Sequence, residues 1–399
     1  MRKTFLSTLA LFLLLLGAPS LCNAGTNKKQ QSAKVRINWN EAAETATQSL
    51  IRHFWNKDTH YFNYIADEFN LNTHPGYWPQ AHAMDAVVDA FLRTGDEKYY
   101  RMFGEWYEGI KAVNSTQVNV GYCNDYFDDT EWVALTMLRI FNTRKEERYL
   151  STAKVQWEWV KSGWNDYCGG GIAWERSKHL YSKNACSNGP GALLGARMYQ
   201  ITHDASDLEW AEKIYAWERS HLYNAQTGAI YDNMNGNTGE VSVGFSLTYN
   251  QGTFIGAAHE LYKITGKRQY LDDAQQAAIF AITDKSQLNA EYNVLRDEGK
   301  GDGGLFKGIL MRYFVRLMKD PDIDPANARK FEDFFNHNVQ VLWQMGTEQP
   351  LCLFGPDWTK APGNTTQLTS QTSACMTIEA KAWADEHDRV FRKSRKAKK

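Results

Sequence analysis

Two consecutive carboxylates, Asp128 and Asp129, precede the apolar stretch from Val133 to Phe141. This stretch is typical of a buried helix, so both acids are expected at a helix start, where the partial positive charge favours ionised carboxylates. Repulsion between two neighbouring carboxylates raises the pKa of one of them. The pair would therefore combine an ionised carboxylate with a protonated one, as acid–base catalysis requires.

Cleavage of a glycosidic bond with retention of configuration needs a carboxylate nucleophile and a carboxyl proton donor about 5 to 5.5 Å apart, a separation that consecutive residues can reach. A purely structural alternative exists, because Asp128 as N-cap and Glu131 at N3 would form a capping box. This segment alone leaves both interpretations open. Asp125 could orient Asp129 or cap a turn.

Aromatic residues make up 13% of the sequence, with 14 Trp and 20 Tyr, and several lie beside glycines and amides ahead of expected helices. Flat rings can cover the apolar face of a sugar while amides bind its hydroxyls, although turns and caps use the same residues. The segments rich in these residues are 75–80, 121–129, 169–174, 183–190, 245–252 and 301–307. We expect them on one face, with helices at 133–141, from Gly191 and at 253–264.

Other chemistries find no support in the sequence. The histidines form no H-E-x-x-H pattern, and no G-x-S-x-G nucleophile motif occurs, so no metal and no cofactor is predicted. The formal net charge of −1 indicates no nucleic-acid partner. No stretch is long and apolar enough to predict a transmembrane helix.

Helical periodicity runs from near Asn40 almost to the end, which predicts an all-α protein. One sequence pattern recurs along the chain: an apolar helix end, a polar turn, and a new helix that begins with an aromatic residue. Its marker threonines, Thr94, Thr143, Thr202 and Thr265, are 49, 59 and 63 residues apart, the length of one helical hairpin with a variable loop. About six such hairpins fit in the chain, which predicts a single-domain (α/α)6 barrel.

The first residues resemble a secretory signal, because Arg2 and Lys3 precede an apolar run. We expect a signal peptide at 1–24, a flexible lead-in at 25–36, the barrel at 37–388 and a basic tail at 389–399. Cleavage after Ala24 is favoured, although Cys22 could instead carry a lipid anchor. The mature protein would be periplasmic or on the cell surface. Its five remaining cysteines indicate buried small side chains with one or two disulfides at most.

Six segments together resemble the bacterial α-1,6-mannanases of glycoside hydrolase family 76, and they occur in the family's order. They are 77–82, 128–132, 170–174, 183–185 with 187–188, 249–252 and 302–308. The resemblance implies an (α/α)6 barrel and endo-hydrolysis of α-1,6-mannan with retention. It also implies that Asp128 is the nucleophile and Asp129 the acid/base. The chain departs from the family pattern at Ala173, Cys186 and Gly189-Pro190.

By the same resemblance, twelve residues are expected to bind the sugar chain: Trp78, His82, Asp125, Trp174, Lys183, Asn188, Tyr249, Asn250, Gln251, Asp302, Phe306 and Lys307. Two alternative functions stay open. The chain could be a non-catalytic mannan-binding protein on the same barrel. It could also be another barrel enzyme, either an unsaturated-uronide hydrolase or an epimerase, and an epimerase would be expected to rely on histidine chemistry.

Overall fold

The computed structural model describes residues 37–69, 76–114 and 121–397, and the expected signal peptide, Cys22 and the lead-in lie outside these ranges. The described part contains twelve α-helices. They are α1 (Trp39–Phe54), α2 (Trp78–Thr94), α3 (Glu97–Val113), α4 (Phe127–Arg144), α5 (Glu147–Lys161), α6 (Ala185–Thr202), α7 (Ala205–His221), α8 (Thr248–Thr265), α9 (Arg268–Thr283), α10 (Gly303–Met318), α11 (Pro325–Met345) and α12 (Leu368–Ala397).

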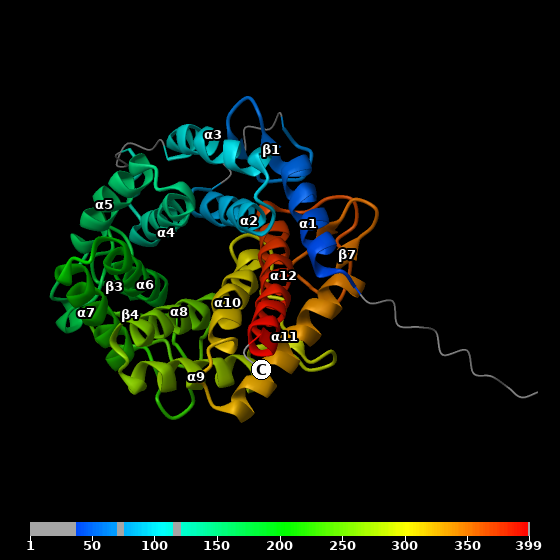
Figure 1. Cartoon of the computed structure of the whole chain (residues 1–399). Helices are drawn as coiled ribbons and strands as arrows, with labels where there is room; N and C mark the ends of the chain where they lie inside the picture. Colours follow the sequence, from blue (N-terminus) through cyan, green and yellow to red (C-terminus); the bar gives the residue numbers. More distant parts are fainter. Residues whose placement is uncertain (1–36, 70–75, 115–120, 398–399) are drawn as a thin grey trace, which may run out of the picture. The chain divides into compact units, whose positions relative to one another are not determined.

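The helices of the unit 38–399 form two concentric rings (Figure 1). The inner ring is closed, because α2 contacts α4, and the contacts continue through α6, α8 and α10 to α12, which packs back on α2. Five outer helices pack on the inner helix that precedes them in the chain: α3 on α2, α5 on α4, α7 on α6, α9 on α8 and α11 on α10. The first helix, α1, packs on the last, α12, and so completes the outer ring. The predicted (α/α)6 barrel is therefore confirmed.

The marker threonines end the inner helices. The hydroxyl of Thr94 donates to the Ala90 carbonyl at 2.8 Å and accepts from the Asp96 amide at 3.1 Å, and Thr265 binds its own neighbours in the same way. Gly95 and Gly266 follow in the left-handed region, each at φ 68°, where a glycine carries no steric penalty. Two residues then suffice to start the outer helix. The local sequence thus encodes each hairpin.

The inner and outer helices differ in how many of their residues are buried. In the inner helix α6 every residue from Ala185 to Ala196 is buried, as expected for a helix with neighbours on all sides. The outer helix α3 buries a single stripe that includes Tyr99, Phe103 and Trp106. Small residues let inner helices approach closely: a Cβ on Gly252 of α8 would lie 2.6 Å from the Cα of Leu310 in α10.

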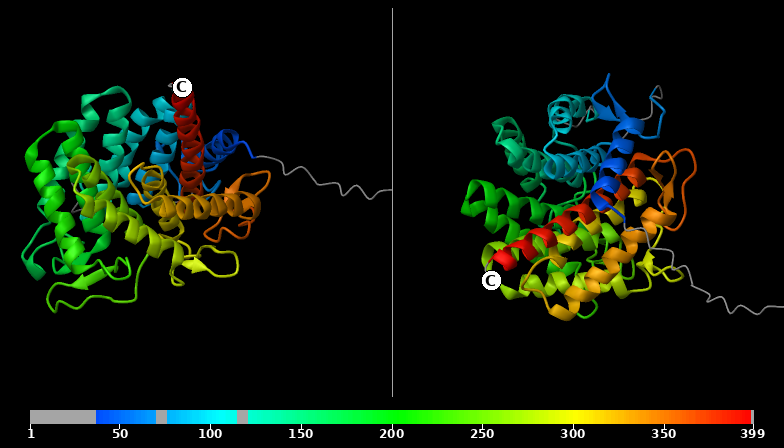
Figure 2. Two further views of the ribbon diagram at one scale, coloured as in Figure 1. Left: turned by 60° about the horizontal axis from the view of Figure 1, so that its bottom comes forward. Right: turned by 45° about the vertical axis from the view of Figure 1, so that its right-hand side comes forward.

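Four two-stranded antiparallel sheets lie between helices. Three are hairpins: β1 (Trp55–Asn56) with β2 (Tyr61–Phe62), β5 (Leu288–Asn289) with β6 (Val294–Leu295), and β7 (Thr347–Glu348) with β8 (Leu353–Phe354). The fourth pairs β3 (Ser182–Asn184) with β4 (Asn233–Asn235), which are separated in the sequence by α6 and α7. Figure 2 shows strand hairpins at one end of the barrel and the C-terminal end of α12 at the other. Helix α12 continues to Ala397, so residues 389–397 of the expected basic tail are helical.

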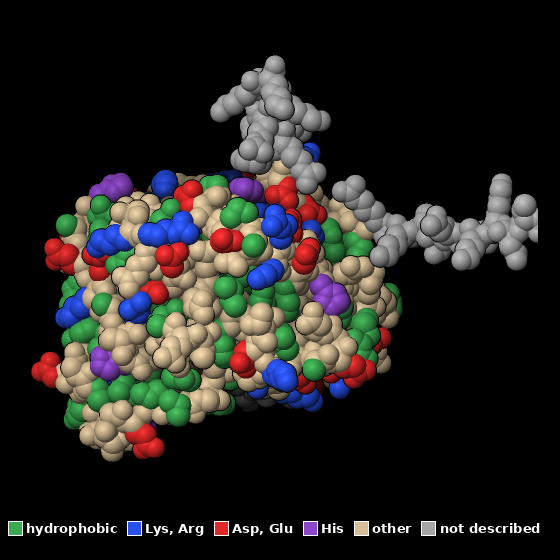
Figure 3. All heavy atoms as spheres, turned by 90° about the horizontal axis from the view of Figure 1, so that it is seen from below, with side chains coloured by type: hydrophobic (Ala, Val, Ile, Leu, Met, Phe, Trp, Pro, Cys, Tyr) green, Lys and Arg blue, Asp and Glu red, His purple; other side chains and the backbone are tan. Residues whose placement is uncertain are grey.

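Acidic and basic side chains are interspersed over the face in Figure 3, in line with the balanced composition. Within the described ranges no helix is long and apolar enough to cross a membrane. The same residues contain no group of three or more side chains that could hold a metal ion. Five cysteines are free thiols, and four of them are buried, so no disulfide joins the described elements.

Candidate active site

The carboxylates Asp128 and Asp129 lie in the first turn of α4. The N-cap of this helix is Tyr126, which has extended backbone angles and makes no side-chain capping bond. Glu131 is fully buried, and neither of its carboxyl oxygens has a hydrogen-bond partner within the described part of the chain. The capping box is therefore wrong, because both of its members lie two residues too deep in the helix.

Asp128 is surrounded by groups that stabilise its ionised form. The thiol of Cys186, at the start of α6, donates a hydrogen bond to its carboxylate, and the backbone amides of Asp128 and Asp129 do the same. Burial raises the pKa of Asp128, and these three donors oppose the rise. One oxygen, Oδ1, has no partner in the described protein and is free to react.

Among the described residues, no comparable donor stabilises the ionised form of Asp129. Burial raises its pKa well above the ordinary range, and the negative charges of Asp128 and Asp302 raise it further. Of the two neighbouring carboxylates, Asp128 is therefore the one that ionises more readily, and Asp129 keeps its proton to higher pH.

An aromatic cluster lies beside the carboxylates. Tyr249 stacks on Phe306 with ring centroids 4.0 Å apart and an interplanar angle of 12°. The Trp78 ring lies 6.3 Å from Phe306, and its Nε1 donates to Asp302 Oδ1 at 3.1 Å. Tyr249 also hydrogen-bonds the Cys186 thiol. The cluster joins α2, α6, α8 and α10 around the start of α4 and offers flat, partly exposed rings to a ligand.

His82 is buried one turn into α2, with its ring 4.7 Å from Trp132 and 5.5 Å from Trp78. Neither ring nitrogen has a partner within the described residues. Burial lowers the pKa of His82 to about 3, so the ring is neutral at physiological pH. His82 therefore acts as an uncharged ring that packs against Trp78 and Trp132.

Two helices begin earlier than expected. Helix α6 starts at Ala185 instead of Gly191 and includes Pro190, and α8 starts at Thr248 instead of Thr253. Asn188 and the segment 249–251 are therefore helical. Asn188 is fully buried, with Oδ1 accepting from the Ile172 amide at 2.8 Å.

The two lysines predicted to bind sugar are fully buried instead of facing solvent. The ammonium of Lys183 donates to Asn165 Oδ1 at 2.6 Å and to the Gly171 carbonyl. That of Lys307 donates to the Pro356 carbonyl and lies 4.7 Å above the Trp358 ring. Lys183 thus holds a loop through a side-chain amide and a backbone carbonyl, and Lys307 holds another through a backbone carbonyl.

Amides and acids complete the surroundings. Asn250 donates to Asp232 Oδ1 at 2.8 Å, and the buried Gln251 amide lies 2.8 Å from the Ser246 hydroxyl. Asp125 is buried and accepts from the Ser177 hydroxyl. Asp302 is exposed at the start of α10, and its charge acts on both Asp128 and Asp129.

Trp174 is partly exposed at the rim, 5.0 Å from the Tyr126 ring. Tyr126, with 37% of its surface exposed, was not among the residues expected to bind sugar. Its position two residues before Asp128 could have indicated that it lies at the site. Asp232 was also missed; its charge reaches Cys186 and Tyr249. No local motif marks Asp232, because only the pairing of β3 with β4 brings it to the site.

Comparison with known proteins gives one consistent group. Residues 38–393 match the family described as glycosyl hydrolase family 76. The fold superposes with a TM-score of 0.81 on an α-1,6-mannanase of Salegentibacter sp. HEL1_6 at 38% identity, covering 87% of this chain and 100% of that one. A second structure of that enzyme, 37% identical, is an inactive variant with two consecutive aspartates replaced by alanine, in complex with α-1,6-mannotetrose.

A fungal protein is similar as well. The mannan endo-1,6-alpha-mannosidase DCW1 of Candida glabrata is 31% identical over 303 residues. The match covers 69% of this chain and 62% of the fungal protein. The chain thus spans less than two thirds of the length of this relative.

Proposed function

Because the chain belongs to glycosyl hydrolase family 76, we propose that it is a retaining endo-α-1,6-mannanase that cleaves the backbone of fungal-type mannan. The observation that carries the proposal is the pair of consecutive carboxylates, Asp128 and Asp129, whose surroundings separate their pKa values. The inactive relative, changed at two consecutive aspartates and bound to an α-1,6-mannose oligomer, supports the same pair.

In the first step, Asp128 attacks the anomeric carbon of the mannose residue while Asp129 donates its proton to the departing glycosidic oxygen. The bond from the anomeric carbon to that oxygen breaks, and a covalent ester of Asp128 forms. The thiol of Cys186 and the helix amides keep Asp128 ionised before the attack. Burial, with repulsion from Asp128 and Asp302, raises the pKa of Asp129 and keeps it protonated for its role as acid.

In the second step, Asp129, now a carboxylate, removes a proton from a water molecule, which attacks the same anomeric carbon. The ester bond breaks, Asp128 is released as a carboxylate, and Asp129 is again protonated. Two inversions leave the product with the α configuration. No cofactor is needed for either step.

The sugar chain would lie across the aromatic cluster of Trp78, Tyr249 and Phe306, with Trp174 at the rim. Stacking of sugar rings on these faces supplies affinity, and Asp302 and Asp232 supply hydrogen-bond acceptors for hydroxyls. The buried residues Lys183, Asn188, Gln251 and Lys307 would act through the loops and helix starts that they hold.

The test is digestion of linear α-1,6-mannan by the wild type and by the variants Asp128→Asn and Asp129→Asn. We expect reducing ends and short oligomers from the wild type, the α anomer first by NMR, and a loss of at least about a hundredfold in each variant. Unchanged hydrolysis in both variants would refute the catalytic assignment. Mannan binding without new reducing ends from the wild type would favour the non-catalytic alternative, and an epimerised or hydrated product would favour the other barrel enzymes.

We further propose that the protein is exported and acts in the periplasm or on the cell surface. Mannan is a large polymer, so its hydrolysis has to take place where the polymer is, and the apolar run after Lys3 supports export. Fractionation of cells, with fatty-acid labelling of the wild type and of Cys22→Ala, distinguishes a free periplasmic enzyme from a lipoprotein.

A further inference from the structure

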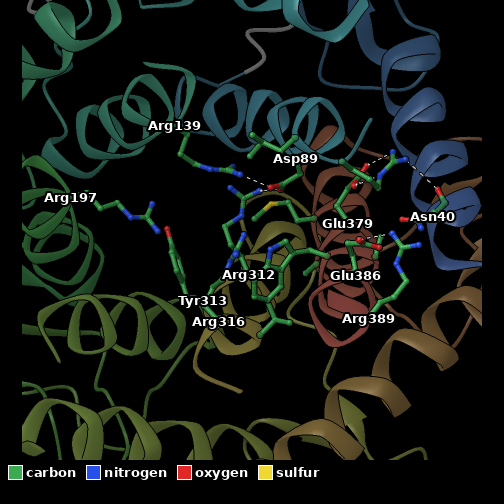
Figure 4. Close-up of a pocket in the computed structure, with 17 residues that line it drawn as sticks. Asn40, Asp89, Arg139, Arg197, Arg312, Tyr313, Arg316, Glu379, Glu386 and Arg389 are labelled. Atoms are coloured by element: carbon green, nitrogen blue, oxygen red, sulfur yellow. Dashed lines mark hydrogen bonds and ion pairs between the residues drawn. The ribbon is translucent and has the colours of Figure 1, made fainter. Parts of the chain in front are cut away.

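A cavity of about 790 Å³ opens at the end of the barrel away from the carboxylates. Asp129 and Arg139 are ten residues apart on α4, which places the cavity roughly 15 Å from the active site along that helix. Six arginines and three carboxylates line it. Figure 4 shows Arg139, Arg197 and Arg312 reaching into this space from three inner helices.

Most of these arginines are already paired. Arg139 and Arg312 share Asp85 and Asp89. Arg93 binds Glu379 at 2.9 Å and Glu44 at 3.0 Å, and Arg389 binds Glu386 at 2.6 Å. Arg197 has only a long pair with Glu260, at 3.6 Å.

Arg316 is different. No carboxylate of the described residues lies within ion-pair distance of its guanidinium, which stacks at 3.6 Å over the Trp383 ring. Its side chain is exposed to the cavity. Burial among protein atoms and the charges of Arg139, Arg197 and Arg312 lower the pKa of Arg316 to about 10, against the opposing effect of Asp89. An anion would relieve this repulsion.

A second cavity, of about 500 Å³, adjoins the first and shares Arg139, Arg197, Arg316 and Trp383 with it. It adds Lys263 and Lys319 to the cationic lining. Lys319 pairs with Glu332 at 3.2 Å and with Asp388 at 2.8 Å, and Lys263 lies 3.8 Å from Glu260. The acids of this cavity, Glu260 and Asp320, also bind Arg197 and His259. Arg316 therefore lines both cavities, and the lining of each holds more basic side chains than carboxylates.

Helix dipoles explain part of this arrangement. Six parallel inner helices direct their C-terminal ends here, and cations near such ends are stabilising. The helix dipoles alone do not explain why four guanidinium groups lie so close together. They also do not explain why the Arg316 guanidinium has no carboxylate partner, although it is repelled by the other three. A ligand that binds guanidinium groups through several oxygens does account for both features.

We propose that this cavity binds an oxyanion, a phosphate group either free or carried by a small molecule, with Arg316 and Arg197 as its principal ligands. The volume exceeds that of a single phosphate and lies in the range of small-molecule sites. The site is separate from the mannan-degrading carboxylates and does not depend on the proposed activity.

The test is isothermal titration of the whole protein with inorganic phosphate, glucose 6-phosphate and glucose, at ionic strength held constant with sodium chloride. We expect saturable binding of phosphate or of the sugar phosphate and none of glucose. Tighter binding of glucose 6-phosphate than of phosphate would identify a phosphorylated small molecule as the ligand, and equal affinities would identify the free ion.

Arg316→Gln should weaken this binding by about tenfold or more, because a charge-assisted contact is lost. Arg52→Gln, an exposed arginine on α1, is the matched control and should bind as the wild type does. If Arg316→Gln does not fold, Arg197→Gln provides the same comparison. No binding to the wild type at millimolar phosphate, or equal affinity in wild type and cavity variant, would overturn the proposal and leave the helix dipoles as the explanation.

Discussion

The thiol of Cys186 donates a hydrogen bond to the carboxylate of Asp128, from a helix that begins more than fifty residues later in the sequence. The same thiol accepts from the Tyr249 hydroxyl, so a tyrosine, a cysteine and an aspartate form one chain of hydrogen bonds. This relationship makes Cys186 a positioning residue for the proposed nucleophile.

Removing the thiol should change the pH dependence of catalysis. The hydrogen bond lowers the pKa of Asp128, so Cys186→Ala should raise that pKa and move the acid limb of kcat/KM to higher pH, by about half a unit to one unit. Cys186→Ser keeps a donor and should leave the limb near its wild-type position. Identical pH profiles for wild type and Cys186→Ala would contradict this role, which initial rates on α-1,6-mannan from pH 4 to 9 would reveal.

The charge of Asp302 should shift the same profile in the opposite sense. Its carboxylate raises the pKa values of both Asp128 and Asp129, so Asp302→Asn should lower both and move both limbs of the profile to lower pH. The amide oxygen still accepts from Trp78 Nε1, which keeps the ring in place. Glu41→Gln, on the outer helix α1, is the control and should change neither limb.

The stacked pair of Tyr249 and Phe306 should govern affinity for the polymer. Phe306→Ala removes one flat face and the support for the other, and the loss of one stacking contact should raise KM by about tenfold with a smaller change in kcat. Tyr262→Ala, at the opposite end of α8, is the matched control. A fall in kcat with KM unchanged would show that Phe306 acts in the chemical step instead.

Glu218 should make stability depend on pH. Neither of its carboxyl oxygens has a partner among the described residues, and burial raises its pKa well above that in the unfolded chain. Below the unfolded pKa of about 4.3 the acid is protonated in both states, and as pH rises the unfolded state gains from ionisation. Glu218→Gln should therefore raise Tm by an amount that increases from pH 5 to pH 8.

The exposed Glu209 of the same helix offers the comparison, since Glu209→Gln should leave Tm nearly unchanged at every pH. A constant Tm difference between Glu218→Gln and wild type across this range would mean that Glu218 is ionised in the folded protein. Scanning calorimetry at several pH values gives both results.

The sequence by itself determined the hairpin series and the location of the carboxylates. Thr94, Gly95 and their counterparts at 265 and 266 terminate helices through bonds to residues within four positions, so their effect is readable from local order. The same holds for Asp128 and Asp129 at the start of α4. Helix starts were less certain, as in α6 and α8, because packing overrides the helix-breaking preference of residues such as Pro190 and Gly252.

Only the tertiary structure decided which residues act on the pair. Cys186 and Asp302 reach Asp128 because closure of the inner ring brings the starts of α4, α6 and α10 together, and no local pattern encodes those distances. The same closure buried Lys183 and Lys307 against backbone carbonyls. Side-chain charge and type are local properties of the sequence, whereas burial and the neighbours that set a pKa are properties of the closed barrel.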